Sequence, residues 1–421
     1  MNRSVWSVSI LWFAAFFGSG STFLIYSILA RELGANFFGL FSSIMAIISV
    51  LSMLAGFGIP QVWLKVFGRE GWCGLRWLVP SLKLSAFSSI IAVAILYTWA
   101  LLGDHSAVAT IAMIVMSAFL LSKTIIEAVV VKLLLEENYL QLSCWQVAPN
   151  LLVLLAILFI GNLSSDVLRV FMIYALIGGL FVMLGAYELS RMRPPYFKLH
   201  GHGRYKSGEC AGLPSIRSLL GEAWPFATAS VFAFTYSQSD ILMVKYISGN
   251  TQAGFYSVAS IILTAVLMFP AVLYGKYLLP KLHRWANHDH KRFYETYRKG
   301  NIAMLLGGFG FMLIVSIASD YAIPVVYGEQ YVASIGLVKL ICFLIPIYFL
   351  AYSVGSVLVT KQYMKIKVRL MGYSGLINII LNALLIPTYQ AKGAAFASII
   401  SSALLLAQYF YMAERKVFKT D

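Results

Sequence analysis

The chain has 421 residues, of which 60% are hydrophobic and 12% are charged, and its net charge is +15. A soluble domain is roughly half apolar and a quarter charged, so this composition excludes an ordinary soluble protein and predicts lipid as the solvent for much of the surface. Twelve membrane spans of about 20 residues each would use over half of the chain, which leaves no room for a separate soluble domain.

Twelve long apolar runs follow one another along the sequence. Because each run is continuously apolar, we expect α-helices rather than the alternating strands of a membrane barrel. We also expect the first run to be retained, since it lacks a clear cleavage site and leads directly into the second. The predicted spans are residues 8–29, 38–59, 78–101, 107–130, 142–161, 167–189, 219–243, 253–279, 301–319, 334–359, 368–387 and 391–413.

The basic residues fall mainly on one side of the predicted membrane. With the N-terminus inside, 24 of the 32 lysines and arginines lie in inward segments and four lie in outward segments. Cytoplasmic loops are enriched in Lys and Arg, so this distribution predicts that both termini are cytoplasmic. It also gives the positive net charge a membrane explanation, where a soluble protein of this charge would suggest nucleic-acid binding.

The connection at 190–218 divides the runs six and six, and the other long connection, 280–300, is inward too. We therefore predict an N-terminal six-helix lobe at 1–190, a basic cytoplasmic linker at 191–217 and a C-terminal six-helix lobe at 218–421. A short similarity links the lobes, because Gly39 in ANFFGLFSS and Gly254 in QAGFYSVAS each precede an aromatic residue, a serine and a span. An even number of spans separates them, which favours parallel repeats, although such starts to a span are common in unrelated helices.

Four stretches together resemble the polysaccharide-export flippases of the Wzx, or O-antigen translocase, type. These flippases share the MOP superfamily with the MATE drug antiporters and the lipid II flippases. Glu222, Trp224, Pro225 and Asp240 stand where the family usually has its Glu, Trp-Pro and Asp, whereas Gln390 replaces a usual glycine. The stretches are ARELGANFFGLFSS at 30–43, EAWPFATASVFAFTYSQSDILMVKYISGNTQAGFYSVAS at 222–260, YGEQYVAS at 327–334 and INIILNALLIPTYQAKGAAFASIISS at 377–402.

This resemblance implies two six-helix, MATE-like lobes around a central cleft, working by alternating access. The implied activity is the translocation of an undecaprenyl-pyrophosphate-linked oligosaccharide repeat unit, for O-antigen, lipopolysaccharide, capsule or exopolysaccharide biosynthesis, across the bacterial inner (cytoplasmic) membrane. The superfamily suggests a proton or sodium gradient as the energy source. A polysaccharide polymerase and a chain-length regulator are possible partners under this hypothesis, and nucleic acid is not a partner.

Charged residues inside predicted spans are the candidates for function, because a central Lys or Asp costs about 2.5–3.5 kcal/mol to insert. Fixed cations suit a diphosphate, so the candidate substrate-binding residues are Arg31, Lys83, Lys123 and Lys276. The candidate coupling or gating residues are Glu127, Glu222 and Asp240.

Each candidate also has a structural interpretation. Lys123 and Glu127 are four residues apart and could pair within one helix. Lys83 and Lys276 lie near enough to the inner surface to extend their charges out of the membrane. Asp240 could pair with Lys245, and Arg31 could tie the first two helices together.

Nothing in the sequence indicates an enzyme. A Walker A pattern, a nucleophile–base pair and a metal-ligand cluster are all missing from the chain, so we expect no catalytic residue, metal or cofactor. The four cysteines lack C-x-x-C or zinc-ligand spacing, so we expect no disulfide framework. The main alternative is a MATE-type antiporter for a small molecule or ion, which would need an acidic site, whereas the buried charges here are mainly basic. A membrane polymerase or ligase would need a large outward loop, and an inert scaffold is the remaining alternative.

Overall fold

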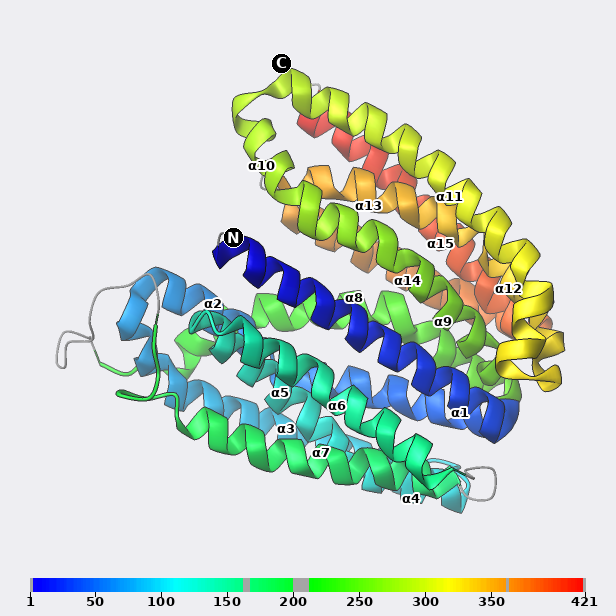
Figure 1. Cartoon of the computed structure of the whole chain (residues 1–421), viewed down its shortest axis with the longest axis horizontal. Helices are drawn as coiled ribbons and strands as arrows, with labels where there is room; N and C mark the ends of the chain where they lie inside the picture. Colours follow the sequence, from blue (N-terminus) through cyan, green and yellow to red (C-terminus); the bar gives the residue numbers. More distant parts are fainter. Residues whose placement is uncertain (1–2, 162–166, 200–211, 361–362, 419–421) are drawn as a thin grey trace. The chain divides into compact units, whose positions relative to one another are not determined.

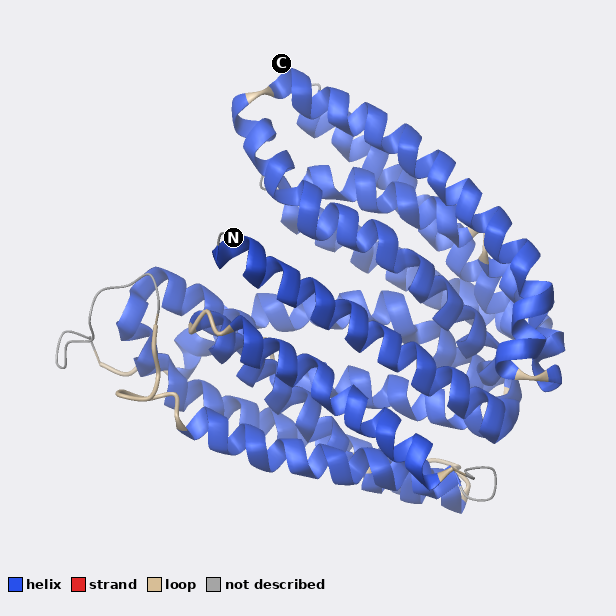
Figure 2. Cartoon of the chain, viewed as in Figure 1, coloured by secondary structure: helices blue, strands red, loops and turns tan. Residues whose placement is uncertain are grey.

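The computed structural model describes the backbone of residues 3–161, 167–199, 212–360 and 363–418, without the side chains at 3–9, 232–237, 276–277, 280, 287, 360 and 365. Every regular element in these ranges is helical (Figure 2), so the prediction of an all-α protein is confirmed. Residues that contact one another group into two compact units, each a bundle of helices (Figure 1). Unit 1 comprises Met1–Ile25 and Ile44–Val231, and unit 2 comprises Tyr26–Ser43 and Phe232–Asp421.

Unit 1 is a bundle in which α5 lies at the centre. The α5 helix packs against α2, α3, α6 and α7, and α4 packs against α3 and α7 (Figure 1). The elements that contribute to unit 1 are α1 (Arg3–Gly56, in part), α2 (Ile59–Glu70), the 3-10 helix η1 (Gly71–Trp77), α3 (Leu78–Leu102), α4 (Ala107–Val115), α5 (Ser117–Leu135), α6 (Tyr139–Ile160), α7 (Val167–Ser190) and the start of α8 (Ile216–Ser248).

Unit 2 is a second bundle, centred on α13 and α15. The α13 helix packs against α9, α11 and α15, and α15 packs closely against α14 (Figure 1). Besides parts of α1 and α8, its elements are α9 (Asn250–Val272), the π-helix η2 (Leu273–Leu278), α10 (Leu279–His288), α11 (His290–Tyr327), the 3-10 helix η3 (Glu329–Ser334), α12 (Ile335–Ile341), α13 (Leu344–Thr360), α14 (Met364–Tyr389), α15 (Ala391–Met412) and the π-helix η4 (Ala413–Phe418).

Several boundaries differ from those predicted from apolar runs. The first two predicted spans correspond to two helical segments of α1 that meet directly at a kink, without the predicted eight-residue connection. The kink is at Gly34, whose φ of 74° lies in the left-handed region that glycine tolerates. The connection at 280–300 is itself helical and consists of α10, which ends at His288, and the start of α11 at His290. The cysteine spacing indicates no disulfide framework, but Cys73 in η1 is disulfide-bonded. Spacing along the chain does not show which cysteines folding brings together.

The α2 helix was not predicted because its apolar residues cover only one face. That face is buried and includes Val62, Trp63, Val66 and Phe67. Trp63 is held further by a hydrogen bond from its indole nitrogen to the Ser81 hydroxyl, at 2.7 Å. The opposite face carries Lys65 and Arg69, so α2 presents a row of cations while its other side is packed into unit 1.

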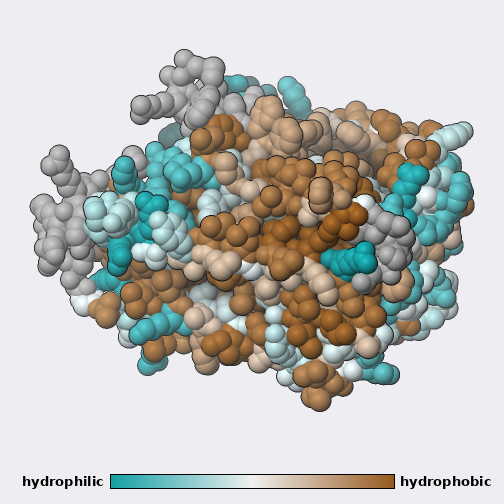
Figure 3. Space-filling model, turned by 60° about the horizontal axis from the view of Figure 1, so that its bottom comes forward, coloured by the Kyte–Doolittle hydropathy of each residue, from teal (hydrophilic) through white to brown (hydrophobic). Residues whose placement is uncertain are grey.

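The surface is that of a membrane protein. Many large apolar side chains are exposed, including Leu176 at 75% and Phe159 at 93%. In the view of Figure 3 apolar residues cover most of the face, and hydrophilic residues gather toward its ends. Among the described residues, eight helical segments are long and apolar enough to cross a membrane, or nine if the bent pair Glu329–Ile341 and Leu344–Val359 forms one span. The first of these segments, Ile10–Leu102, is 93 residues long and includes α1, α2 and α3.

Within unit 2, Gly39 of α1 packs against the start of α9, and Gly254 of α9 packs against α1. These are the two glycines of the short sequence similarity. A Cβ atom added at Gly39 would overlap the carbonyl oxygen of Asn250 and come within 2.7 Å of the Gly254 nitrogen. A Cβ atom added at Gly254 would in turn overlap the carbonyl oxygen of Ala35. Small residues let the backbones of two helices approach closely, so this contact between α1 and α9 depends on both glycines.

Candidate functional site

Lys123 is a membrane-embedded cation in unit 1 whose hydrogen-bond partner is neutral. It lies on α5, and its ammonium donates a hydrogen bond to the Ser49 hydroxyl of α1, at 2.9 Å. The same nitrogen lies 5.7 Å from the centre of the Phe119 ring. A hydroxyl and an aromatic face orient an ammonium without neutralising it, so the positive charge remains available to an anion.

Glu127 turns to a different partner, although it is four residues from Lys123 on the same helix. It is exposed and accepts a hydrogen bond from the Gln61 side chain of α2, at 3.2 Å. Among the described residues, Lys123 and Glu127 form no ion pair with each other. The predicted intrahelical ion pair is therefore not formed at contact distance, although the Glu127 charge still attracts the Lys123 ammonium from further away.

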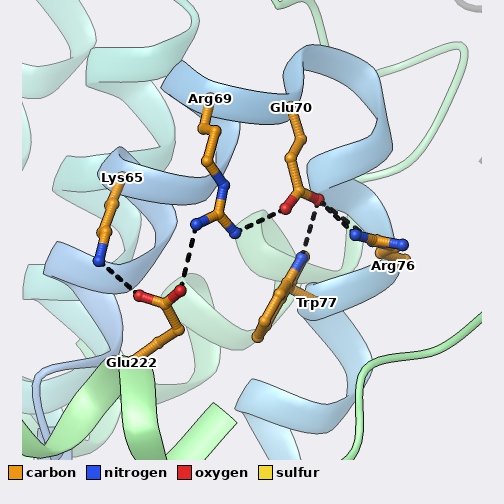
Figure 4. A network of polar contacts seen from close by, with 6 residues as sticks. All are labelled: Lys65, Arg69, Glu70, Arg76, Trp77 and Glu222. Atoms are coloured by element: carbon orange, nitrogen blue, oxygen red, sulfur yellow. Dashed lines mark hydrogen bonds and ion pairs between the residues drawn. The ribbon is translucent and has the colours of Figure 1, made fainter. Parts of the chain in front are cut away.

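Glu222 belongs to a network of charges at one end of unit 1 (Figure 4). Its carboxylate on α8 pairs with Lys65 at 2.6 Å and with Arg69 at 3.2 Å, both on α2. Figure 4 shows the Arg69 guanidinium between two carboxylates, and its other nitrogen pairs with Glu70 at 2.7 Å. The network therefore ties the start of α8 to the polar face of α2.

Glu70 is the second carboxylate of this network and lies where α2 meets η1. It accepts hydrogen bonds from the Arg76 guanidinium, at 3.1 Å, and from the Trp77 indole nitrogen, at 3.0 Å. Partial burial opposes its ionisation, but the hydrogen bonds from Arg69 and Trp77 and the charge of Arg76 outweigh this, and the pKa of Glu70 is lowered. The carboxylate thus stays ionised under mildly acidic conditions.

We expect Glu70→Gln to remove an acid-dependent part of the stability. A carboxyl whose pKa is lower in the folded state contributes stability above its unfolded pKa, and this contribution disappears as the pH falls through the folded pKa. The effect should be about 1 kcal/mol or less, because the partners are partly exposed to solvent. Melting temperatures in detergent from neutral pH down to about pH 3 would measure it. A variant that loses stability in acid as steeply as the wild type would contradict this assignment.

Asp240 lies at the centre of a buried polar cluster in unit 2. Its side chain is on α8, and the residue is 7% exposed. Its carboxylate accepts hydrogen bonds from the Tyr256 hydroxyl and from the Asn382 amide, each at 2.6 Å, and also from the Ser398 hydroxyl. The Asn382 amide also donates to the Asn378 side chain, at 2.9 Å. Four helices, α8, α9, α14 and α15, therefore supply oxygen and nitrogen atoms to one site.

The Asp240 carboxyl group lacks a positively charged partner among the described residues. None of the described lysines or arginines pairs with Asp240, and Lys245, the partner considered from the sequence, has a buried ammonium without a hydrogen-bond partner. The Asn382 carbonyl oxygen is also buried and unpaired among the described atoms. A buried carboxylate without a positive partner is costly, so the cluster is suited to holding a proton or a small cation.

The remaining candidates lie apart from these sites. Arg31 is exposed in unit 2, and its guanidinium donates to the carbonyl oxygen of Val325 on α11, at 3.3 Å, so it contacts α11 rather than tying the first two spans together. Lys83 is exposed on α3, without a hydrogen bond or ion pair to any described residue. The side chain of Lys276 lies outside the part of the chain that the structure describes.

One buried ion cluster was missed by the sequence analysis. Lys132 on α5 is 2% exposed, and its ammonium pairs with Glu188 of α7 at 2.5 Å and with Glu136 at 3.3 Å. Lys132 was missed because it counts as one of many inward basic residues near the end of a span. The i,i+4 spacing of Lys132 and Glu136 was the only signal of an ion pair in the sequence. Glu188 is distant in the chain and reaches Lys132 only in the folded structure.

Comparison with known proteins agrees with this fold. The chain matches the family described as "Polysaccharide biosynthesis protein" over residues 5–285. It is 25% identical over 407 residues to a "Probable low-salt glycan biosynthesis flippase Agl15" of Haloferax volcanii, covering 94% of this chain and 80% of the relative. It is 23% identical over 395 residues to an "Uncharacterized membrane protein MJ1375" of Methanocaldococcus jannaschii, covering 92% of each chain.

Two of the solved structures that it resembles are membrane transporters. A lipid II flippase, MurJ, in an inward closed conformation matches with a TM-score of 0.74 at 12% identity, covering 97% of this chain and 87% of that one. An inward-facing multidrug resistance transporter of the MATE family matches with a TM-score of 0.70 at 13% identity, covering 99% and 98%. The fold is thus MATE-like and MurJ-like, and the matched family consists of transporters, not enzymes. The chain belongs to the polysaccharide biosynthesis protein family, as its sequence motifs indicate.

Proposed function

We propose that this protein is a flippase that moves a lipid-linked oligosaccharide from the inner to the outer leaflet of a cell membrane. Membership of the polysaccharide biosynthesis protein family supports this, as does the likeness to a probable glycan biosynthesis flippase. The observation that carries the proposal is Lys123, because a membrane-embedded cation held by a neutral hydroxyl is suited to an anionic diphosphate.

We further propose twelve spans in two six-helix lobes, 1–190 and 218–421, joined by the linker at 191–217, with both termini cytoplasmic. Within Ile10–Leu102, residues 10–33, 35–56 and 78–102 are each long enough to cross a bilayer of about 30 Å at 1.5 Å per residue. The 33 residues of α8 are also long enough. These four segments, the seven other candidate helices and the bent pair Glu329–Ile341 and Leu344–Val359 give twelve spans, which supports the proposal.

Lys123→Ala should abolish glycan export while leaving the protein at normal abundance in the membrane. The substitution removes the cation that we assign to the diphosphate, whereas the lost hydrogen bond to Ser49 should cost only about 1 kcal/mol. Export is measured as surface polysaccharide in a strain that carries only the variant gene, and abundance is measured by immunoblot of membranes.

Two control variants separate charge from packing at this position. Lys123→Arg keeps the positive charge and should retain part of the export, whereas Lys123→Met keeps the length without the charge and should behave like Lys123→Ala. Normal export by the Met variant would remove Lys123 from the substrate site.

We also propose that the Asp240 cluster couples transport to a proton or sodium gradient. Its carboxyl group, which lacks a positively charged partner among the described residues, and the amide and hydroxyl groups around it support this role, because hard cations prefer oxygen ligands. Glu127 and Glu222 remain proposals for gating, since each links α2 to another helix of unit 1.

The carrier and the membrane are finer proposals that rest on resemblance. We propose undecaprenyl diphosphate as the carrier and a bacterial inner membrane as the location, with a polysaccharide polymerase and a chain-length regulator as possible partners. A MATE-type antiporter is the second candidate, supported by the structural likeness to a MATE transporter.

A deletion strain of the source organism distinguishes these two candidate functions. If the protein is a flippase, lipid-linked units accumulate on the cytoplasmic leaflet, surface polysaccharide is lost, and the cloned gene restores it. Unchanged polysaccharide with altered drug resistance would favour the antiporter.

A further inference from the structure

A cavity of about 730 Å³, here called the alkyl cavity, lies within unit 1 among α2, α3, α5, α7 and the end of α1. Its walls are almost entirely apolar, and Leu82, Ile90, Leu121 and Val182 are among them. The described residues that line it include no charged side chain. Its volume is in the range of pockets that bind small organic ligands, so it can enclose part of one extended hydrocarbon chain.

The mouth of this alkyl cavity lies between α3 and α7. The α5 helix packs against both of them and forms part of the wall. Four lining residues are exposed, namely Ala86 and Ile90 of α3 and Ala186 and Ser190 of α7. Ile90 is 68% exposed. The cavity is therefore open to the apolar surface of unit 1 between these two helices.

Two cations stand at one end of this mouth. Lys83 is three residues before Ala86 and seven before Ile90, so it lies on the same face of α3, and its ammonium is free of partners among the described residues. Arg191 directly follows Ser190 at the end of α7, and its guanidinium lies over the rings of Tyr187 and Tyr196, at 5.8 and 5.5 Å. An apolar cavity with cations at one end matches a lipid that has a hydrocarbon chain and an anionic head group.

We propose that the alkyl cavity holds the first isoprenoid units of a polyprenyl carrier lipid, with its diphosphate received at Lys83 and Arg191 before it passes to Lys123. This inference rests on the proposed function and identifies where the carrier is received. Two cations match the two or more negative charges of a diphosphate better than the single charge of a phospholipid phosphodiester. The α3 and α7 helices then keep the hydrocarbon chain in the membrane beside the protein while the sugar is moved.

The test is photocrosslinking with a polyprenyl diphosphate that carries a diazirine on its isoprenoid chain and no sugar. The full chain is reconstituted in phosphatidylethanolamine vesicles, illuminated and digested, and the labelled peptides are identified by mass spectrometry. We expect label on the segments of α3, α5 and α7 that line the cavity. Label found only on segments that do not line the cavity would overturn the proposal. So would labelling that phosphatidylglycerol prevents as well as unlabelled polyprenyl diphosphate does.

Variants of the cavity and of its mouth sharpen this result. Ala128→Trp places an indole in the cavity and should lower labelling by at least about tenfold. Excluding two methylene groups of the lipid chain from the cavity would weaken binding by that factor. Lys83→Gln should weaken labelling several-fold and Lys83→Arg should restore it, and neither exposed substitution should affect folding. Leu176→Trp, at an exposed position on α7, is the matched control and should label like the wild type.

The same vesicles distinguish a failure of this inference from a failure of the proposed function. Flipping of a lipid-linked oligosaccharide by protein whose cavity is never labelled would overturn the lipid site alone. A labelled cavity that responds to Ala128→Trp and Lys83→Gln, in protein that flips no glycan, would support the lipid site and contradict the flippase.

Discussion

Asp240→Asn should abolish gradient-driven transport while leaving the fold intact. Asparagine has the shape of aspartate, and the Tyr256 and Ser398 hydroxyls can turn to accept hydrogen bonds from its amide nitrogen. The variant therefore keeps the cluster paired but removes the one negative charge that can bind a proton or cation. Transport into proteoliposomes with and without an imposed sodium or pH gradient would show a wild type that responds to one gradient and a variant that responds to neither.

A second variant distinguishes charge from packing at this site. Asp240→Ala leaves the Tyr256 hydroxyl and the Asn382 amide without their acceptor, and each buried unpaired group costs about 1–3 kcal/mol. We therefore expect Asp240→Ala to melt at a lower temperature than Asp240→Asn. Gradient-stimulated transport at the wild-type rate in Asp240→Asn would remove Asp240 from coupling and leave it a structural role.

Gly39→Ala should destabilise the protein more than any surface substitution. The new methyl group would overlap the carbonyl oxygen of Asn250, which is backbone and cannot move aside as a side chain can. The contact between α1 and α9 has to open, at a cost of about 3 kcal/mol. A lower melting temperature and a lower yield of folded protein in detergent would measure this.

The reciprocal glycine and a distant one provide the controls for this contact. Gly254→Ala should be destabilising to a similar extent, and because both substitutions open one contact, the double variant should cost less than the two single costs added together. Gly20→Ala, also on α1, has no atom within 4 Å of its added Cβ and should be neutral or slightly stabilising. Normal melting of Gly39→Ala would contradict the close approach of these helices.

Helices that are apolar on most sides could be predicted from the sequence, whereas their breaks could not. The run at 78–101 corresponds to α3 at Leu78–Leu102 to within one residue, because lipid-exposed helices need apolar residues throughout. The break at Met116, which divides the fourth run into α4 and α5, falls inside a continuously apolar stretch. Hydropathy contains no signal for such a break, because both helices remain in the same apolar environment.

The sequence proposes candidate residues, but the partners of those residues could not be predicted from it. The cost of a charge in lipid pointed to Lys123 and Asp240, and both are embedded polar centres in the structure. Their partners, Ser49 and Ser398, are small polar residues of kinds that are common in membrane helices and are distant in the chain. The alkyl cavity was not predictable for the same reason, since residues of five different helices form its walls.

The proposed flippase activity is tested most directly with purified protein in vesicles that contain a fluorescent lipid-linked oligosaccharide. Membrane-impermeant dithionite quenches only the label on the outer leaflet, so empty vesicles lose about half of the signal. A sodium or pH gradient is imposed on all samples. If the protein is a flippase, nearly all of the fluorescence becomes accessible in vesicles with the wild type, whereas vesicles with Lys123→Ala behave like empty ones. Quenching that stops at half with correctly folded wild type would contradict lipid-linked glycan translocation by this protein.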